Sequence, residues 1–174
     1  IEEVIQWGNT GLTTLNDAFN GNHILKKIAS DESGSLSKVT SMANAFSKCT
    51  ALIYIPENLL NHCPPNLEVN GIFSKCLSLQ YIPEDLFISL TETVSFDYIF
   101  SGCDNLSSIP AGLFRMNTNA TNFNGAFSGC NMIEEVPDGL FDHNPLVLSF
   151  YCTFNYCVNL KYVPANIFDN NRKI

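Results

Sequence analysis

Cysteine is the reactive residue type that stands out in this sequence, because an odd number, seven, occurs in 174 residues. Five of them recur at intervals of 27 residues, at Cys49, Cys76, Cys103, Cys130 and Cys157. Such a column could hold a metal, form disulfides or lie in a core. Zinc sites usually draw on close C-x-x-C pairs, which are absent here. Side chains at equivalent positions of stacked units run parallel, which disfavours disulfides. We therefore expect buried free thiols that act as small apolar side chains.

Two further cysteines, Cys63 and Cys152, are off this register, and the expected architecture does not explain them. Cys152 lies five residues before Cys157 and is the better candidate for exposure. A catalytic thiol needs a neighbouring base or cation that stabilises the thiolate. Cys152 has no such base nearby in sequence and Cys63 has only the adjacent His62, so a thiol enzyme is the least favoured function.

Histidines and carboxylates do not form a catalytic pattern. His62 and His143 share a register but are three repeats apart, which is about 14–15 Å at one strand spacing per repeat. The pairs Glu2-Glu3 and Glu134-Glu135 are adjacent residues whose side chains point apart, which disfavours an acid/base pair. One polar register predicts a capping or hydrogen-bonded ladder, with a calcium row as the alternative: Asn16, Asn70, Asp97 and Asn124. We predict no catalytic residue, no metal, no cofactor and no enzyme.

Composition excludes several classes of protein. The chain carries 9 Lys and Arg against 17 Asp and Glu, a formal net charge of −8, and has no basic cluster to neutralise phosphates, so no nucleic-acid partner is expected. No apolar run approaches the roughly 20 residues that span a bilayer, so no membrane insertion is expected in this segment. With 45% hydrophobic and 15% charged residues, the chain is not a disordered acidic tail.

The 27-residue period extends far beyond the cysteines. The unit reads F-x-x-C-x-x-L-x-x-I-P-x-x-L-F and recurs without gaps. All 13 phenylalanines fall on three of its registers. The six of the F-x-x-C register are Phe19, Phe46, Phe73, Phe100, Phe127 and Phe154. Repeats of this length bury their apolar faces only against copies of themselves, so the pattern predicts a solenoid.

Each part of the unit suggests a local structure. The spacing of Met42, Ala45, Phe46 and Cys49 is that of one face of a two-turn helix. In the L-x-x-I-P part of the unit, residues such as those at 53–55 predict a short strand that ends at the proline. The P-x-x-L-F segment predicts a single helical turn, of α or 3₁₀ type, since proline suits a first helical position. We therefore predict an α/β solenoid, a leucine-rich-repeat-like right-handed superhelix of 27-residue repeats, each with a short helix, a short strand and a helical turn.

The ends of the chain depart from the repeat. We predict one solenoid domain over 1–174 of about six repeats, with an atypical N-terminal repeat at 1–45 and regular repeats at 46–174. In the first unit Asn22 replaces the cysteine and Ala29 the proline, and 30–35 reads as a solvated loop. Trp7 has no counterpart in the repeats and is expected to plug the end of the core. The sequence stops at Ile174 within a unit and without a visible cap, which predicts a fragment or a solenoid that continued.

The F-x-x-C-x-x-L-x-x-I-P unit resembles the BspA-like leucine-rich repeats of bacterial cell-surface proteins. The stretch VTSMANAFSKC at 39–49 is also similar to repeats of mycoplasma-type surface lipoproteins. The resemblance extends from about Leu12 to Phe168. It implies an extracellular or bacterial cell-surface location and adhesion to a protein, such as a host matrix or other cell-surface protein.

The best candidate for a binding site is the outward side of the predicted strands. One register there contains Tyr54, Tyr81, Ser108, Glu135 and Tyr162, and its neighbour contains Ile53, Gln80, Ser107, Glu134 and Lys161. Tyrosines suit contact surfaces, although stacked tyrosines also stabilise a sheet directly. These positions vary between repeats while the core positions stay fixed. We predict a monomeric, adhesin-type protein-interaction module, with a non-catalytic spacer or stalk of a larger surface protein as the alternative.

Overall fold

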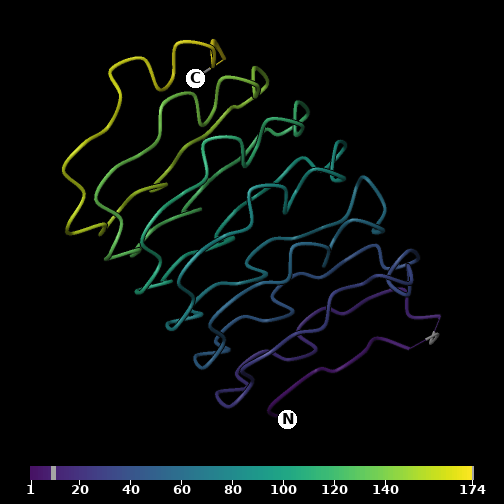
Figure 1. Ribbon diagram of the computed structural model, residues 1–174. Helices are drawn as coiled ribbons and strands as arrows, with labels where there is room; N and C mark the ends of the chain where they lie inside the picture. The colour runs from purple at the N-terminus through teal and green to yellow at the C-terminus, as the bar shows by residue number, and fades with distance from the viewer. Residues whose placement is uncertain (9–10, 174) are drawn as a thin grey trace.

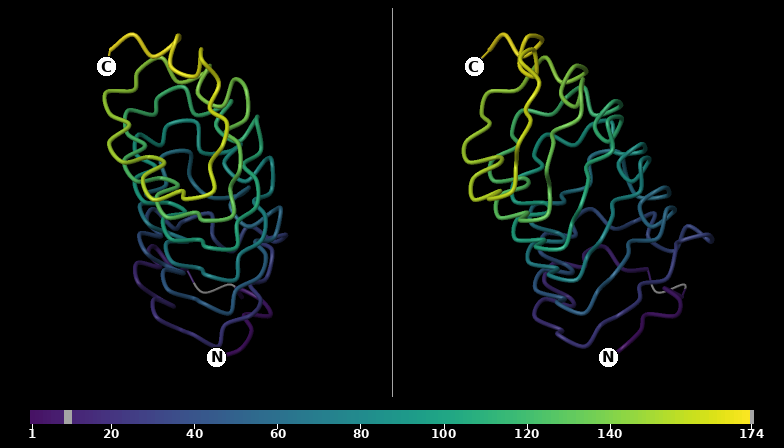
Figure 2. Two further views of the ribbon diagram at one scale, coloured as in Figure 1. Left: turned by 90° about the vertical axis from the view of Figure 1, so that its left-hand side faces the viewer. Right: turned by 60° about the vertical axis from the view of Figure 1, so that its left-hand side comes forward.

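The chain forms a solenoid of stacked coils, which follow one another from the N-terminal to the C-terminal end (Figures 1 and 2). The computed structural model describes residues 1–8 and 11–173, so Ile174, at which the sequence predicts an interrupted repeat, lies outside the described residues. No α-helix and no extended strand occurs in the described residues. Regular pairing there is limited to six isolated parallel bridges, such as the one between Ser41 and Glu68.

The predicted two-turn helix is wrong, although its inward face is right. Met42, Ala45, Phe46 and Cys49 are all fully buried. Within this segment, however, Asn44 and Lys48 have φ angles of 54° and 58°. An α-helix needs φ near −63° at every residue, so two left-handed residues four apart exclude it. The same two positions are left-handed in every coil, and five of these twelve residues are glycines: Gly21, Gly71, Gly102, Gly125 and Gly129.

The segment uses its backbone groups in alternation instead. Ala45, Ser47 and Cys49 donate N–H bonds to the carbonyls three residues earlier, while the residues between them donate to the following coil. Asn44, for example, donates to the Asn70 carbonyl at 2.9 Å. Every buried backbone polar group of the segment thus finds a partner without a helix. We call this part of each coil the ladder wall; it comprises 13–21, 40–48, 67–75, 94–102, 121–129 and 148–156.

Four chains of peptide groups run along the ladder wall from coil to coil. In one chain Asp17 N–H donates to the Ala43 carbonyl, Asn44 N–H to Asn70, and Gly71 N–H to Asp97, and the series continues to Tyr151. Two parallel chains, which start at Phe19 and Gly21, are also unbroken. The chain that starts at Leu15 lacks one link, the bond from Val69 N–H to the Ser95 carbonyl.

The predicted strand is an extended segment with sparse pairing, which we call the extended wall; it comprises 52–55, 79–82, 106–109, 133–136 and 160–163. Gln80 N–H donates to the Ile53 carbonyl at 3.1 Å. Among the described residues, bridges on this wall occur only at its two ends, between Glu135 and Tyr162 and, at the equivalent segment 25–28 of the first repeat, between Glu3 and Lys27. More bridges lie on the ladder wall, at the register of Thr14 and Ser41. The predicted helical turn is a single turn, in which Leu59 N–H donates to the Pro56 carbonyl at 3.2 Å.

Phenylalanine rings stack through the core in columns that follow the three sequence registers. In the F-x-x-C register, neighbouring ring centroids are 5.4–5.8 Å apart and nearly parallel. The Phe114 and Phe123 rings join the other two columns at 4.6 Å. Rings at these separations are favourably placed, beyond the apolar area that they bury. The core is therefore one continuous aromatic stack along the solenoid.

The cysteine column confirms the expectation of buried free thiols. All five in-register cysteines are unpaired and buried. Each thiol donates a weak hydrogen bond to the carbonyl of the phenylalanine 30 residues earlier, as Cys103 does to Phe73 at 3.2 Å. Cysteine therefore serves two purposes here, as a small apolar side chain and as the donor that connects neighbouring coils.

Cys63 is not off-register, contrary to the sequence interpretation. It shares a column with Leu36 and Leu90, and with three asparagines that are 0–2% exposed: Asn117, Asn144 and Asn171. Each asparagine amide donates two hydrogen bonds to carbonyls of the preceding coil; Asn144 donates to Phe114 and Asn117 at 3.1 and 2.9 Å. This buried polar column escaped the sequence analysis because its first three members are apolar.

Cys152 also has a place in the repeat. It occupies the left-handed column of Asn44, Gly71, Tyr98 and Gly125, with a φ of 57°. Large side chains and glycines alternate in this column because each large side chain lies over the glycine of the next coil: a Cβ on Gly125 would collide with the Tyr98 ring. The architecture therefore explains both of the cysteines that the sequence analysis left over.

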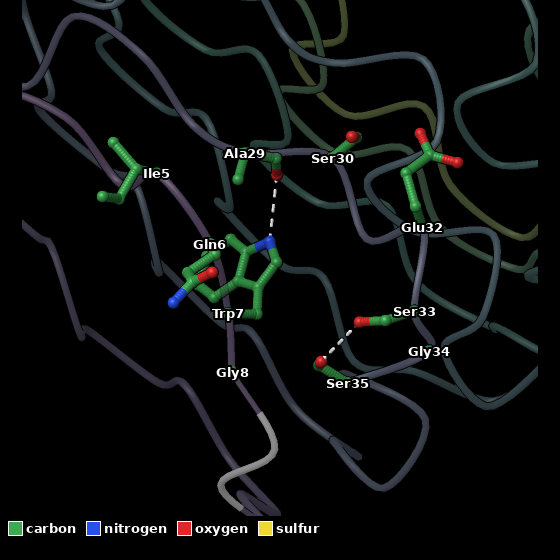
Figure 3. Close-up of a pocket in the computed structure, with 10 residues that line it drawn as sticks. All are labelled: Ile5, Gln6, Trp7, Gly8, Ala29, Ser30, Glu32, Ser33, Gly34 and Ser35. Carbon is green, nitrogen blue, oxygen red and sulfur yellow. Dashed lines mark hydrogen bonds between the residues drawn. The ribbon is translucent and has the colours of Figure 1, made fainter.

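Trp7 plugs the N-terminal end of the core, as predicted. Its ring packs edge-on against Phe19 and Phe46, with centroids 6.3 Å from each, and its indole N–H donates to the Ala29 carbonyl. Figure 3 shows Trp7 beside the atypical loop of the first repeat. Asp31 stabilises that loop by accepting the N–H groups of Ser35 and Leu36.

Candidate interaction face

The extended wall presents the predicted binding residues to solvent. Tyr81 and Tyr162 are 50% and 52% exposed, and Tyr54 is half-buried. The remaining members of the two registers are exposed: Ile53, Gln80, Ser107, Ser108, Glu134, Glu135 and Lys161. We call these ten residues the extended face. The structure brings them together as two adjacent rows along the coils.

Part of this face is already engaged in an ion pair. Lys161 Nζ lies 2.9 Å from a Glu134 carboxylate oxygen, and both side chains are more than 60% exposed. An exposed pair of this kind contributes about 0–1 kcal/mol to stability. A partner could therefore separate the two side chains at little cost, so both remain usable for binding.

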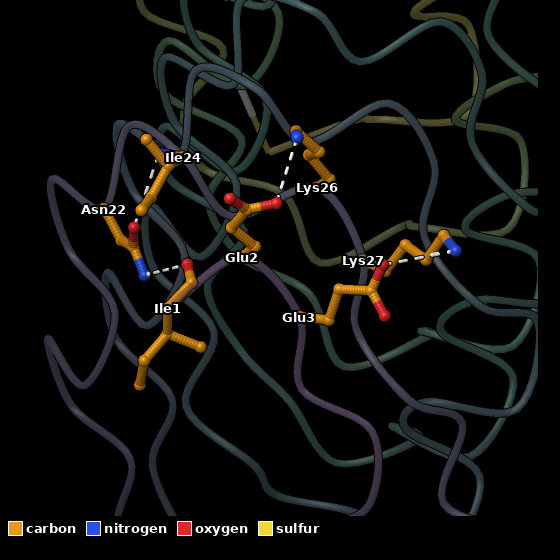
Figure 4. A network of polar contacts seen from close by, with 7 residues as sticks. All are labelled: Ile1, Glu2, Glu3, Asn22, Ile24, Lys26 and Lys27. Atoms are coloured by element: carbon orange, nitrogen blue, oxygen red, sulfur yellow. Dashed lines mark hydrogen bonds and ion pairs between the residues drawn. The ribbon is translucent and has the colours of Figure 1, made fainter.

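Ion pairs also mark the N-terminal end of the same wall. The first three residues lie along the coil at 24–27, where Glu3 bridges Lys27 (Figure 4). Glu2 and Glu3 pair with Lys26 and Lys27 at 3.1 and 3.3 Å. The N-terminal segment thus adds a partial coil over the first repeat. Its carboxylates form surface ion pairs, in place of the acid/base pair that the sequence analysis had disfavoured.

Tyrosines of the extended face do not stack on each other. None of the aromatic ring pairs found in the described part of the chain includes a tyrosine. Ring stacking among the tyrosines, the alternative explanation for this column, is therefore not what holds the wall together. Their rings are free to contact another molecule.

A second set of exposed tyrosines lies on the ladder wall, and the sequence analysis missed it. Tyr98, Tyr151 and Tyr156 are 50%, 70% and 75% exposed. All six tyrosines of the chain thus stand on the outward side of the two walls, whereas every phenylalanine belongs to a stacked column, in which Phe168 at the C-terminal end is 39% exposed. The sequence analysis missed these tyrosines because it placed the binding surface on the predicted strands alone.

The polar register at the start of the ladder wall is a hydrogen-bonded ladder at three of its four predicted members, while the buried Asn70 Oδ1 has no hydrogen-bond partner in the described residues. The Asn16, Asp97 and Asn124 side chains each accept the backbone N–H of the same register one coil later, at 2.8–3.0 Å. Among the described residues, no group of three or more His, Cys, Asp or Glu side chains is arranged to hold a metal. The ladder therefore explains this register without the calcium row.

Burial makes the in-register thiols and Cys63 poor nucleophiles. It raises the pKa of Cys49 to about 11 and that of Cys63 to about 12. The pKa values of Cys76, Cys103, Cys130 and Cys157 are raised for the same reason. Because the thiolate is the reactive form, these groups stay inert near neutral pH.

Native thiol titration is expected to reveal one fast cysteine. Cys152 alone among the seven is partly exposed. With an aromatic disulfide reagent at pH 8, we expect one thiol to react rapidly and six to react only after unfolding in denaturant. The Cys152→Ser variant should lose the fast phase while its slow phase stays the same. Two or more fast thiols in the native protein would contradict the buried column.

A hollow of about 700 Å³ lies at the N-terminal end of the solenoid. Figure 3 shows its lining, in which Trp7 and Gln6 face the loop of Ser30, Glu32 and Ser35. The Ser33 and Ser35 hydroxyls bond to each other across the loop at 2.8 Å. The hollow exists because polar residues replace the apolar pair that fills the core in later repeats.

No family model matches the sequence, and the comparison with curated proteins finds no relative. Solved structures with a similar fold include a leucine-rich cell-surface protein from Faecalibacterium prausnitzii, at 16% identity and a TM-score of 0.44, which covers 100% of this chain and 55% of that one. A leucine-rich repeat protein of T. pallidum has 22% identity and a TM-score of 0.33, with 80% and 73% covered. The Drosophila Toll–Spatzle complex has 18% identity and a TM-score of 0.42, with 92% and 24% covered.

The chain thus spans about half the length of the Faecalibacterium protein. In the part that the structure describes, no helix has the length and apolar character to cross a bilayer. Bacterial leucine-rich-repeat proteins are among the structures to which the chain is similar, as the resemblance of its repeat implies.

Proposed function

We propose that the chain is a non-enzymatic protein-interaction module of an extracellular or bacterial cell-surface protein of the BspA-like leucine-rich-repeat kind. The observation that supports this most directly is the contrast between the two sides of the extended wall. Inward positions keep the same apolar residue types from coil to coil, and outward positions change from tyrosine to serine, glutamate and lysine. A surface that varies over a constant scaffold suits recognition.

The extended face has the chemistry of a contact surface. Tyr54, Tyr81 and Tyr162 provide rigid amphipathic rings, which lose little conformational entropy on binding. Serine and glutamine between them provide hydrogen bonds, and the Glu134–Lys161 pair provides both charges. We propose an adhesin-type role in which this face binds a host matrix protein or another cell-surface protein as a monomer.

Binding to immobilised matrix proteins tests this role. We expect the protein to bind at least one of purified fibronectin, fibrinogen, laminin and collagen. The triple variant Tyr54→Ser, Tyr81→Ser, Tyr162→Ser should bind at least 10-fold more weakly, because aromatic anchors carry much of the energy of such interfaces.

A matched control uses the other wall. Tyr151→Ser with Tyr156→Ser removes two exposed tyrosines outside the extended face and should leave binding unchanged. Equal losses in both variants would refute the assignment of the face. Absence of binding to all four proteins would favour the non-catalytic spacer of a larger surface protein.

A further inference from the structure

A row of carboxylates runs along one side of the extended face. The proline that ends each segment of the extended wall is followed directly by Glu57, Glu84 or Asp138 in three of the five coils, and by alanine in the other two. All three acidic side chains are exposed. We call this part of the coils the proline edge; it comprises 56–57, 83–84, 110–111, 137–138 and 164–165. The extended face thus has a negatively charged border.

Carboxylates outnumber cations on this surface. The extended face and the proline edge together carry five carboxylates and one lysine, and that lysine, Lys161, is paired with Glu134. Arg115 is close to Glu84 across Gly112, but its ion pair is with Asp85. Four carboxylates of the surface therefore belong to none of the ion pairs found among the described residues: Glu57, Glu84, Glu135 and Asp138.

Two of these carboxylates lie near a tyrosine of the extended face. The sequence Y-I-P-E occurs at 54–57 and again at 81–84, one coil later. Three residues span at most about 11 Å even when fully extended, so each ring and its carboxylate can contact the same segment of a partner. An exposed aromatic ring attracts a lysine or arginine side chain through its π face, and a carboxylate attracts it through charge.

The last two coils repeat this combination with residues of neighbouring coils. Glu135 forms a parallel bridge with Tyr162, so the carboxylate of one coil stands beside the ring of the next. Both side chains are exposed, and Asp138 follows on the proline edge. The coil between the two groups has Ser107, Ser108 and an alanine at these places and carries no charge. Aromatic rings and free carboxylates therefore occur together in two groups, one on each side of a neutral coil.

The spacing of the carboxylates favours basic side chains over other cations. A calcium ion needs six to eight oxygen ligands at one point, whereas the proline edge presents one carboxylate per coil. Separate charges along a line match separate arginine or lysine residues along a partner chain. The formal net charge of −8 also attracts a basic partner at long range.

We propose that the extended face and the proline edge bind a basic segment of a protein. Its arginine or lysine side chains lie against the rings of Tyr54, Tyr81 and Tyr162 and pair with the four free carboxylates. This inference rests on the proposed function and narrows it, because it states which kind of protein surface the extended face recognises.

Fluorescence anisotropy with a defined peptide tests the inference. The probe alternates arginine and serine over about 8 residues, enough to span five coils when extended. We expect it to bind, and to bind more weakly as NaCl rises from about 50 to about 300 mM. The same peptide with citrulline in place of arginine keeps the shape but loses the charge, and should not bind.

Variants of the protein locate the site. Glu57→Gln with Glu84→Gln should weaken peptide binding at least 5-fold, because two charge-assisted contacts are lost. Tyr54→Phe with Tyr81→Phe should keep most of the affinity, whereas serine at both positions should lose at least 5-fold, since only the ring is needed. Melting temperatures of all variants check that each one is folded.

Glu92→Gln with Asp142→Asn is the matched control. It removes the same charge from two exposed residues outside this surface and should leave peptide affinity nearly unchanged. Equal losses in the two charge variants would overturn the inference, because they would indicate attraction to the net charge alone. Equal binding of the citrulline peptide would also overturn it.

The matrix-protein assay separates this inference from the proposed function. A matrix protein that needs the three tyrosines but binds the Glu57→Gln, Glu84→Gln variant equally well would overturn the basic-segment inference and leave the proposed function standing. Site-specific binding of the arginine peptide without binding to any of the four matrix proteins would support the inference and count against the adhesin role.

Discussion

Raising the pH from 8 to 10 under reducing conditions is expected to unfold the protein. Buried thiols stay protonated in the folded chain, because burial raises the pKa values of five of them, Cys49, Cys63, Cys76, Cys103 and Cys130. In the unfolded chain the same thiols ionise above a pH of about 8.5. The unfolded state then binds fewer protons than the folded state, so the free energy of unfolding falls as the pH rises.

The effect is large because the thiols act together. Each contributes a loss of about 1.4 kcal/mol per pH unit between its unfolded and folded pKa values, so the five lose about 7 kcal/mol per unit. Total stabilities are typically about 5–15 kcal/mol. Urea midpoints at pH 7, 8, 9 and 10, followed by the fluorescence of the single tryptophan and by circular dichroism, measure this loss.

A variant with one thiol fewer supplies the control. Cys103→Ala should be less stable at pH 7, because it loses a buried group and its bond to Phe73, but its stability should fall with pH about a fifth less steeply. A midpoint that stays constant up to pH 10 would show that the column ionises freely in the folded state. That result would contradict the burial of the thiols.

Phe100→Ala is expected to cost about 3–5 kcal/mol of stability, among the largest effects of a single core substitution. Phe100 is fully buried in the middle of the aromatic stack. Its ring lies 5.8 Å from Phe73 and from Phe127, and 6.1 Å from Phe87. Because coils stabilise each other only through neighbours, a cavity here weakens two interfaces at once.

Phe19→Ala is the matched comparison at the end of the same column. Phe19 is partly exposed and has one stacked phenylalanine neighbour, Phe46 at 5.4 Å. We expect its substitution to cost about half as much as Phe100→Ala. Urea denaturation of both variants gives the two losses. Similar values for the two would mean that the aromatic stack does not distribute stability as a one-dimensional array.

The sequence predicted the core more accurately than the backbone. The 27-residue register correctly placed Phe46, Cys49 and Leu52 inside, because inward positions must repeat in any stacked coil. It did not distinguish a helix from a chain with a left-handed residue every four positions, since both bring residues i, i+3, i+4 and i+7 to one face. The glycines at 71, 125 and 129 were the evidence against a helix, because glycine is costly in the middle of a helix.

The same limit applies to the candidate sites. Counting in steps of 27 from Tyr54 was enough to place the extended face on the surface, because that register has no inward side chain. The Glu134–Lys161 pair and the unpartnered Asn70 depend on which neighbouring coil each side chain leans toward. A linear register contains no information about that direction, so neither could be predicted from the sequence.

The peptide chains of the ladder wall also have an electrostatic consequence. Every N–H in them points toward the following coil and every carbonyl toward the preceding one. Peptide dipoles aligned in this way add up, as they do in an α-helix, whereas those of ordinary sheets largely cancel. The positive end of their sum lies at the C-terminal coil, where the N–H groups of Phe150, Cys152, Phe154 and Tyr156 end the four chains. These chains outnumber the one chain of the wall that points the other way, in which Thr40 N–H donates to the Thr13 carbonyl and Leu148 N–H to Thr121. The ladder wall is thus electrically polar along the solenoid axis, in the direction opposite to that of a helix.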